Sequence, residues 1–143
     1  MSPEDKLAVM DLITSYAFCL DTGDLDGYVD NFAPDGVLHN RAGNLEGREA
    51  IRAYVAHLID IGRVASRPMR LAHLLGIPKI EGDGERCHAE TYIMGPGILD
   101  LAAPKEIGFR HVGVYIDEIV KVDGRWRFAH RTHRVDLAAP GTQ

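Results

Sequence analysis

The stretch that decides the fold reads "SYAFCLDTGDLDGYVDNF" and spans Ser15–Phe32. Its first half continues an apolar pattern at helical spacing that begins at Leu12, which predicts a helix ending before Gly23. Its second half predicts another short helix over residues 24–33. Four aspartates lie in this stretch, but neither register of a calcium-binding loop puts oxygen ligands at all the required positions. We therefore exclude a calcium site.

The regions on either side of this stretch predict the remaining helices and strands. Ser2 is a candidate helix cap, and Pro3 suits the first turn of the first helix. Residues 36–40 predict a short strand, and the amphipathic residues 47–62 predict a third helix. Four long strands are then predicted, over residues 69–80, 85–95, 106–122 and 125–137, with turns at residues 81–85 and 122–126.

This order of elements predicts a single α+β domain over residues 1–143. Helices followed by an antiparallel meander pack on one face of a curved sheet. A sheet wrapped around a helix leaves a cone-shaped apolar cavity, and small-molecule sites are mostly apolar hollows with a few placed polar groups. We therefore expect the partner to be a small hydrophobic molecule.

Composition excludes several function classes. The chain of 143 residues has a formal charge of -5 and no dense basic run, so we expect no nucleic-acid partner. No apolar run approaches the ~20 residues needed to span a bilayer, and the start does not resemble a signal peptide. Cys19 and Cys87 lack metal-site spacing, which is typical of two buried free thiols in a cytoplasmic protein.

Strand alternation identifies one candidate base. In the predicted strand over residues 69–80, His73 shares a face with Leu71, Leu75 and Ile77. A histidine among aliphatic side chains is either a hydrogen-bonded core residue or a base in an apolar pocket. Both interpretations stay open at this point.

Alternation in the last strand separates two sets of residues. Trp126, Phe128 and Arg134 share one face with His130 and Thr132, whereas Arg127, Arg131 and His133 share the other. A buried Arg134 would need a partner, because an unpaired interior charge is very costly. A β-bulge would shift this phase.

The seven histidines do not form a recognisable metal motif. His130 and His133 are three residues apart on a predicted strand, unlike the i, i+4 pair of a helical zinc motif. The chain also lacks a G-x-S-x-G nucleophile elbow and a phosphate-binding loop. We predict neither a metal nor any other cofactor.

The segments "LITSYAFCLDTGDLDGYVDNFAPDGVLHN", "GREAIRAYV", "RLAHLLGIPKIEGDGERCHAETY" and "VGVYIDEIVKVDGRWRFAHRTHRVD" cover nearly the whole chain. In this order they resemble the SnoaL-like branch of the NTF2-like superfamily. The resemblance implies an NTF2-like cone, in which three N-terminal helices pack on a strongly curved, mainly antiparallel mixed sheet. The resemblance is less specific for function than for fold, because this fold hosts dehydratases, isomerases, epoxide hydrolases, polyketide cyclases and non-catalytic proteins.

Within this superfamily the chain most resembles scytalone dehydratase-like and bile-acid 7α-dehydratase-like members. That resemblance implies a catalytic pair of Asp21 at the end of the first helix and His73 on the first long strand. It also implies roles for Tyr16 and Arg134. The additional acid or histidine of those enzymes falls near residues 92–95, where this chain has neither. The hydroxyl of Tyr16 or Tyr92 is then a possible substitute.

These observations predict a cofactor-independent lyase of the dehydratase type, or an isomerase. Its substrate would be a hydrophobic cyclic carbonyl compound or polyol of the polyketide, aromatic or steroid type. The catalytic residues would be His73, Asp21 and Tyr16, and the substrate would contact Arg134, Tyr54, Tyr92, Trp126 and Phe128. Two alternatives remain, a non-catalytic small-molecule-binding protein and the small structural subunit of a ring-hydroxylating dioxygenase. An epoxide hydrolase is less favoured, because the sequence does not provide an Asp-Arg-Asp set whose three side chains would all face the cavity.

We also expect a homo-oligomer, a dimer or a trimer. The aliphatic residues Val112, Val114 and Ile116 are expected to face outward from their strand. Such a surface would require a partner to cover it.

Overall fold

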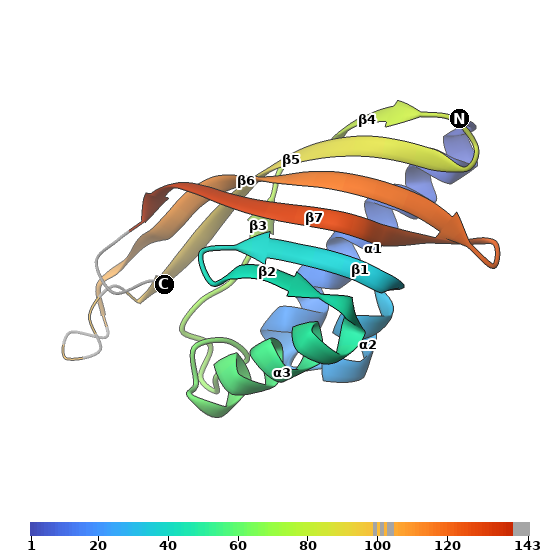
Figure 1. Cartoon of the computed structure of the whole chain (residues 1–143). Coiled ribbons are helices and arrows are strands. Elements are labelled where there is room, and N and C mark those ends of the chain that lie inside the picture. The colour runs from blue at the N-terminus through green and yellow to red at the C-terminus, as the bar shows by residue number, and fades with distance from the viewer. Residues whose placement is uncertain (99, 101, 103–104, 139–143) are drawn as a thin grey trace.

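The computed structural model describes residues 1–98, 100, 102 and 105–138. Within these residues, three helices pack against the concave side of one curved, seven-stranded sheet (Figure 1). This arrangement confirms the α+β class. In chain order the elements are α1 (Pro3–Thr22), α2 (Leu25–Asp30), β1 (Phe32–Asn40), β2 (Gly43–Glu46), α3 (Gly47–Asp60), β3 (Leu74–Leu75), β4 (Lys79–Gly82), β5 (Arg86–Ile98), β6 (Ile107–Val122) and β7 (Arg125–Ala138).

Local chemistry sets both ends of α1. The Ser2 hydroxyl accepts the N–H of Asp5 at 3.0 Å, which caps the first turn. Gly23 ends the helix in the left-handed conformation with a φ of 80°, which glycine adopts without strain. The Asp24 carboxylate then caps α2 by accepting a backbone N–H at 2.9 Å. The predicted boundaries of α1 are therefore confirmed, and Asp24 has a structural role.

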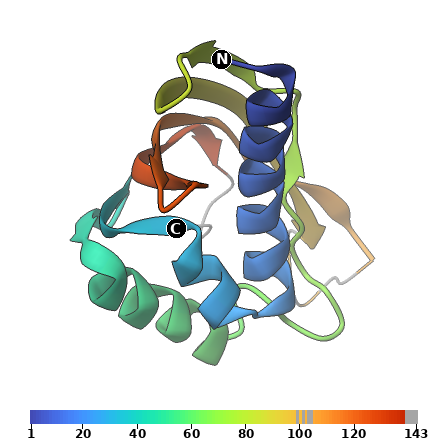
Figure 2. The same cartoon turned by 90° about the vertical axis from the view of Figure 1, so that its right-hand side faces the viewer.

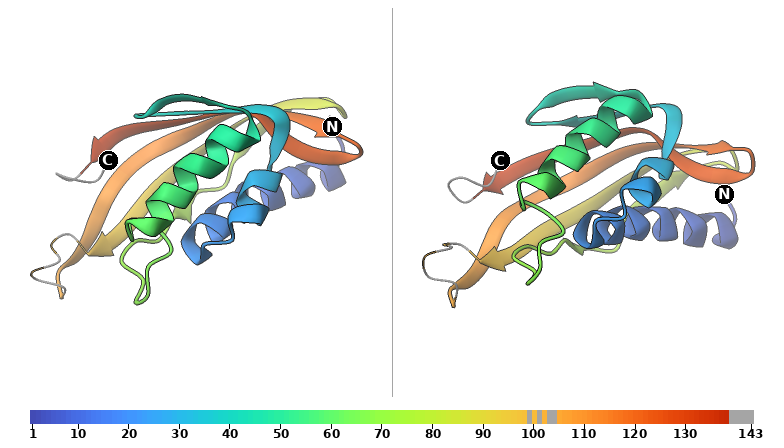
Figure 3. Two further views of the ribbon diagram at one scale, coloured as in Figure 1. Left: turned by 60° about the horizontal axis from the view of Figure 1, so that its bottom comes forward. Right: turned by 90° about the horizontal axis from the view of Figure 1, so that it is seen from below.

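The sheet is mixed. Its strand order is β2-β1-β7-β6-β5-β3, with β4 also paired to β5. The antiparallel neighbours β5, β6 and β7 confirm the predicted meander in part, whereas β1 pairs with β7 in parallel. The sheet curls around α1, and α2 and α3 cover the same side (Figures 2 and 3). This curvature gives the cone expected from the sequence.

In the first half, the structure differs from the sequence prediction at the end of one helix and in one additional strand. The second helix ends at Asp30 and not at residue 33, because β1 begins at Phe32, which is paired with Phe128 of β7. The hairpin strand β2 was not predicted from the sequence. Its four residues are too short to show an alternation pattern.

The long strand predicted over residues 69–80 is also wrong. Only the two residues of β3 and the start of β4 pair there, together with one isolated bridge from Leu71 to Gly97. Gly76 and Pro78 separate the two short strands. Proline lacks the N–H that a strand ladder needs, and glycine weakens a strand interior.

A β-bulge in β7 overturns the alternation expected there. The register shifts so that Ala129 is an extra residue between Phe128 and His130. Phe128 before the bulge and Arg131 after it are therefore both buried, and Arg134 is exposed. The predicted grouping of Arg134 with Trp126 and Phe128 is wrong for this reason.

The inner side of the bulge holds a buried ion pair. The Arg131 guanidinium donates to both carboxylate oxygens of Asp117 at 2.7 and 2.6 Å, and neither side chain is exposed to solvent. Its central carbon lies 3.9 to 4.2 Å from the ring centroids of Phe128, Tyr115 and Tyr16. A fixed positive charge thus lies in the aromatic core of the cone.

The structure also bears on the expectation that aliphatic residues on the outer face of the sheet need a partner chain to cover them. Val114 is buried within this single chain, where its neighbours across the sheet are Tyr92 and Arg134. Val114 therefore does not need a partner chain to cover it, whereas Val112 and Ile116 are only partly buried. The homo-oligomer itself stays a prediction.

Two other expectations concern the cysteines and the membrane. Both cysteines are free thiols, Cys87 buried and Cys19 only partly so. Among the described residues no helix combines the length and the apolar character needed to cross a bilayer.

Candidate active site

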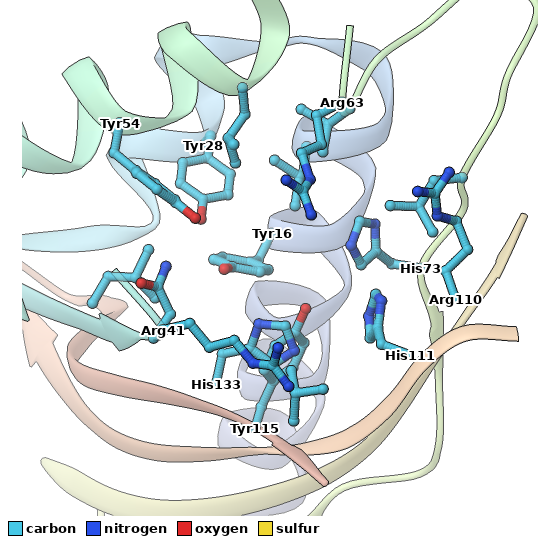
Figure 4. Close-up of a pocket in the computed structure, with 17 residues that line it drawn as sticks. Tyr16, Tyr28, Arg41, Tyr54, Arg63, His73, Arg110, His111, Tyr115 and His133 are labelled. Carbon is cyan, nitrogen blue, oxygen red and sulfur yellow. The ribbon is translucent and has the colours of Figure 1, made fainter. Parts of the chain in front are cut away.

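The open end of the cone contains a cavity of about 120 Å³ (Figure 4). Side chains from all three helices, from β1, β6 and β7, and from the segment after α3 contribute to its lining. Its apolar wall is formed by Leu20, Leu38, Leu58, Val64, Leu71 and Val135. A volume of this size accommodates about one six-membered ring, with the rest of a ligand in the opening.

Asp21 and His73 meet at the edge of this cavity. The Asp21 Oδ1 atom lies 2.6 Å from His73 Nδ1, and its Oδ2 atom accepts the backbone N–H of His73 at 2.9 Å. The side chains are only 12% and 5% exposed. The structure therefore confirms that these two residues pair, and the double attachment fixes the orientation of the imidazole.

The local folding of two segments brings about this pairing. Asp21 lies in the last turn of α1, which the left-handed Gly23 ends immediately afterwards. His73 lies just before β3, in a segment that runs along the edge of the sheet. Since Nδ1 bonds to the carboxylate, the imidazole presents Nε2 as its proton acceptor.

Two tyrosine rings form the cavity wall next to the buried cation. Burial raises the pKa of Tyr16, an effect that the charge of Arg131 and a hydrogen bond from Tyr28 partly offset. Burial also raises the pKa of Tyr115 well above its ordinary value. Both hydroxyls therefore remain protonated near neutral pH and are able to donate hydrogen bonds to a ligand.

Two further histidines extend the site from His73. The rings of His73 and His111 are 5.7 Å apart between centroids, and those of His111 and His133 are 5.5 Å apart. Burial, helped by the neighbouring histidines and arginines, lowers the pKa of His111 to about 4 and of His133 to about 3. The Nε2 atoms of both are buried without a hydrogen-bond partner in the described part of the chain. Both imidazoles are therefore neutral at neutral pH.

The predicted site residues divide into two groups. His73, Tyr16 and Tyr54 line the cavity, and Asp21 lies behind His73. The other four predicted contact residues, Arg134, Tyr92, Trp126 and Phe128, do not line it.

Three physical reasons account for the second group. Tyr92 is 78% exposed, because its neighbours Thr91 and Ile93 face inward and strand alternation turns it outward. Trp126 and Phe128 are buried in the packed end of the cone, where the Trp126 indole N–H donates to Asp5. Arg134 follows the bulge and lies on the outer side.

Several lining residues were missed in the sequence. His111 and Tyr115 lie on the inward face of β6 together with Asp117. The two-residue alternation of side chains along this strand could have predicted that these residues share a face. His133 faces the cavity only because of the bulge at Ala129. The remaining polar residues carried no local signal, and they include Arg41, Arg63 and Arg110.

The histidines do not form a metal site in this geometry. Within the described residues, no three His, Cys, Asp or Glu side chains are grouped so that they could hold a metal ion. Independence from metals and other cofactors stays a prediction.

Solved structures with the same fold establish its class. An NTF2-like protein with a cystatin-like fold from Novosphingobium aromaticivorans is 19% identical, with a TM-score of 0.80 over 97% of this chain and 86% of that one. A candidate scytalone dehydratase from the same organism is 17% identical, with a TM-score of 0.74 over 97% and 94%. The beta subunit of a candidate aromatic-ring-hydroxylating dioxygenase, also from that organism, is 19% identical, with a TM-score of 0.73 over 96% and 93%. These likenesses show the NTF2-like fold.

The sequence family is assigned independently of these structures. No curated protein matches the chain. The SnoaL-like domain family matches residues 2–132, which is nearly the whole sequence. The protein therefore belongs to the SnoaL-like domain family.

Proposed function

We propose that this protein is a lyase of the dehydratase type, or an isomerase, that uses His73 as a general base. The reaction begins when Nε2 of His73 removes a proton from a carbon next to a carbonyl group. Asp21 holds the imidazole in the reactive tautomer and stabilises the imidazolium that forms. In a dehydratase the C–O bond to the β-hydroxyl group then breaks, and the leaving hydroxyl takes the proton from the His73 imidazolium and departs as water. An isomerase instead returns that proton to another carbon.

One observation carries this proposal. The imidazole of His73 is bonded through Nδ1 to a carboxylate at 2.6 Å while its ring lines a cavity. A histidine with only a structural role does not need a cavity in front of its ring. A general base must come within hydrogen-bond reach of the substrate, and a ring that lines the cavity is placed to approach a molecule bound there.

The tyrosine hydroxyls complete the proposed chemistry. A developing enolate oxygen needs donors that keep their protons, and burial keeps Tyr16 and Tyr115 protonated. Tyr115 was not considered from the sequence, which offered Tyr16 or Tyr92. Because Tyr92 lies outside the cavity, we propose Tyr16 and Tyr115 as the donors. These steps require no cofactor.

A non-catalytic role is the competing hypothesis. One structural neighbour is described as a dioxygenase beta subunit, and a ligand-binding protein has the same type of cavity. Neither role requires an oriented imidazole. The partly buried pair of Asp21 and His73 therefore favours the lyase or isomerase.

The experiment that tests the proposal measures proton exchange directly. Cyclic ketones and β-hydroxy ketones are incubated with the protein in D2O, and NMR follows loss of the proton next to the carbonyl and formation of the unsaturated product. We expect the wild type to accelerate exchange, and His73→Ala to lower the rate by about 10²–10⁴-fold.

A matched control uses another histidine–carboxylate pair. His88 bonds to Glu118 at 2.8 Å on the outer face of the sheet, away from the cavity. His88→Ala should leave the exchange rate unchanged. Equal rates for the wild type and His73→Ala would disprove the role of His73 as the base.

A further inference from the structure

Gly95 of β5 leaves room for an imidazole. It is buried, and it is paired across the sheet with His111 of β6. A Cβ atom at position 95 would lie 2.6 Å from Nδ1 and 2.9 Å from Nε2 of His111, and closer still to Cε1. These distances are well inside van der Waals contact. The ring of His111 therefore lies directly over the glycine.

The backbone at Gly95 does not itself require glycine. Five of the described glycines have a positive φ, and Gly95 is not among them. Its position within the long strand β5 is one that residues with a side chain adopt readily. The space that the His111 ring occupies is therefore the reason why a side chain is excluded at this position.

The ring of His111 is held by its neighbours. It lies next to the ring of His73 on one side of the cavity (Figure 4), at 5.7 Å between centroids. The ring of His133 is its other neighbour, at 5.5 Å. His111 is buried, and its Nε2 atom has no hydrogen-bond partner among the described residues. Packing, and not a hydrogen bond at Nε2, therefore sets the position of this ring.

The base of the proposed reaction needs a neighbour of this kind. Asp21 bonds to the backbone N–H and to the Nδ1 edge of His73, whereas Nε2 on the other edge is the atom that takes the proton. A hydrogen bond tolerates a range of angles, so the bond at Nδ1 still allows the Nε2 edge to tilt. A misplacement of about 1 Å lowers an enzymatic rate by about 10²-fold.

His111 is also suited to lie beside a base that becomes charged. Burial lowers the pKa of His111 to about 4, so its imidazole is neutral at neutral pH. A neutral ring does not repel the imidazolium that forms on His73, whereas a cationic neighbour would make protonation of His73 less favourable.

We infer that His111 is a positioning residue of the proposed reaction: its ring lies over Gly95, packs against the imidazole of His73 and keeps Nε2 of His73 directed into the cavity. His111 acts through His73 and does not itself exchange a proton with the substrate. The inference rests on the proposed function, in which His73 is the base. It adds Gly95 and His111 to the residues on which the rate depends.

A measurement without substrate tests the packing directly. NMR relaxation of the labelled Cε1–H group of His73 reports the motion of its ring, and the proton between Nδ1 and Asp21 is observed in the same sample. We expect His111→Ala to increase the ring motion while the Nδ1 proton is retained. This variant only removes atoms and creates no clash, and a thermal melt checks that it folds. Unchanged motion of the His73 ring would overturn the inference.

Gly95→Ala displaces the His111 ring without removing it. We expect kcat for proton exchange to fall about tenfold or more, with KM changed by less than about threefold, because the base is misplaced and binding is retained. Gly84→Ala is the matched control, since nothing lies within 4 Å of its added Cβ atom and its φ is not positive. It should leave both constants unchanged. An equal loss of kcat in the two variants would overturn the inference.

A double variant connects the two residues. When His111 is already alanine, the methyl group of Gly95→Ala has no ring to displace, so it should lower kcat no further. His111→Phe restores a flat, uncharged ring and should recover part of the rate that His111→Ala loses. A group that transfers protons could not be replaced by phenylalanine. Additive losses in the double variant, or no recovery with phenylalanine, would overturn the positioning role.

Failure of the proposed function has a different signature. In that case exchange is absent or independent of His73, while the motion of the His73 ring still increases in His111→Ala. If only the positioning role fails, exchange depends on His73, but His111→Ala has the ring motion and the kcat of the wild type.

Discussion

Two aspartates inside the cone form similar bonds but have different surroundings. Asp117 bonds to Arg131 at 2.7 and 2.6 Å with no exposure of either side chain, in a shell of three aromatic rings. Asp21 bonds to His73 at 2.6 and 2.9 Å at the edge of the cavity. An arginine keeps its charge at all relevant pH values, whereas a histidine exchanges its proton near neutral pH. The comparison indicates that the first pair is structural and the second is suited to chemistry.

The largest expected effect comes from breaking the structural pair. Asp117→Ala leaves the Arg131 charge buried without its carboxylate, which should lower the free energy of unfolding by about 3–5 kcal/mol. Urea denaturation measures this loss. The double variant Asp117→Leu/Arg131→Met should be clearly more stable than Asp117→Ala, because it removes both charges. Equal stability of the single and double variants would contradict a structural ion pair.

Breaking the second pair should affect rate more than stability. Asp21→Asn keeps an oxygen that can accept the backbone N–H of His73, but it no longer stabilises the imidazolium. We expect the proton-exchange rate to fall by about 10²-fold or more, and the free energy of unfolding to change by less than about 2 kcal/mol. Exchange measured by NMR and a thermal melt on the same sample separate the two effects. The opposite result would be a large loss of stability with a normal exchange rate per folded molecule. It would show that Asp21, like Asp117, has a structural role.

The neutral histidines next to His73 predict how stability depends on pH. The pKa of His133 is about 3 in the folded protein, below its ordinary value of 6.5, so the unfolded chain takes up protons first as the pH falls. The free energy of unfolding should therefore decrease below about pH 6.5. His133→Gln should remove about 1–2 kcal/mol of the decrease between pH 7 and pH 5. Urea denaturation at several pH values measures the free energy of unfolding of the wild type and of His133→Gln. If the two proteins lost the same stability between pH 7 and pH 5, His133 would not be neutral and buried in the folded protein.

The smallest expected effect concerns an arginine three residues beyond Arg131. Arg134 is exposed on the outer face of the sheet and does not line the cavity. Arg134→Ala should change the free energy of unfolding by about 0.5 kcal/mol or less and leave the proton-exchange rate within about twofold. Denaturation and the exchange assay check both values. A strong loss of exchange would restore the role that the sequence predicted for Arg134.

The sequence by itself determined those features that depend on neighbours within a few residues. The cap at Ser2, the stop at Gly23 and the apolar spacing between them give α1 its length and place Asp21 at its end. The long strands β5 and β6 follow from alternation in the same way. The resemblance to SnoaL-like proteins then identified the fold and the pairing of Asp21 with His73.

The tertiary structure alone decided which side of β7 faces the cavity. One extra residue, Ala129, turns Arg131 and His133 inward and Arg134 outward. A bulge depends on the register against β6, which no local pattern shows. Arg41, Arg63 and Arg110, which also line the cavity, come from three segments that are far apart in the sequence. Sequence periodicity predicts which face of a single helix or strand is buried. A cavity forms where several elements meet, so the charged residues that line it can be identified only in the folded structure.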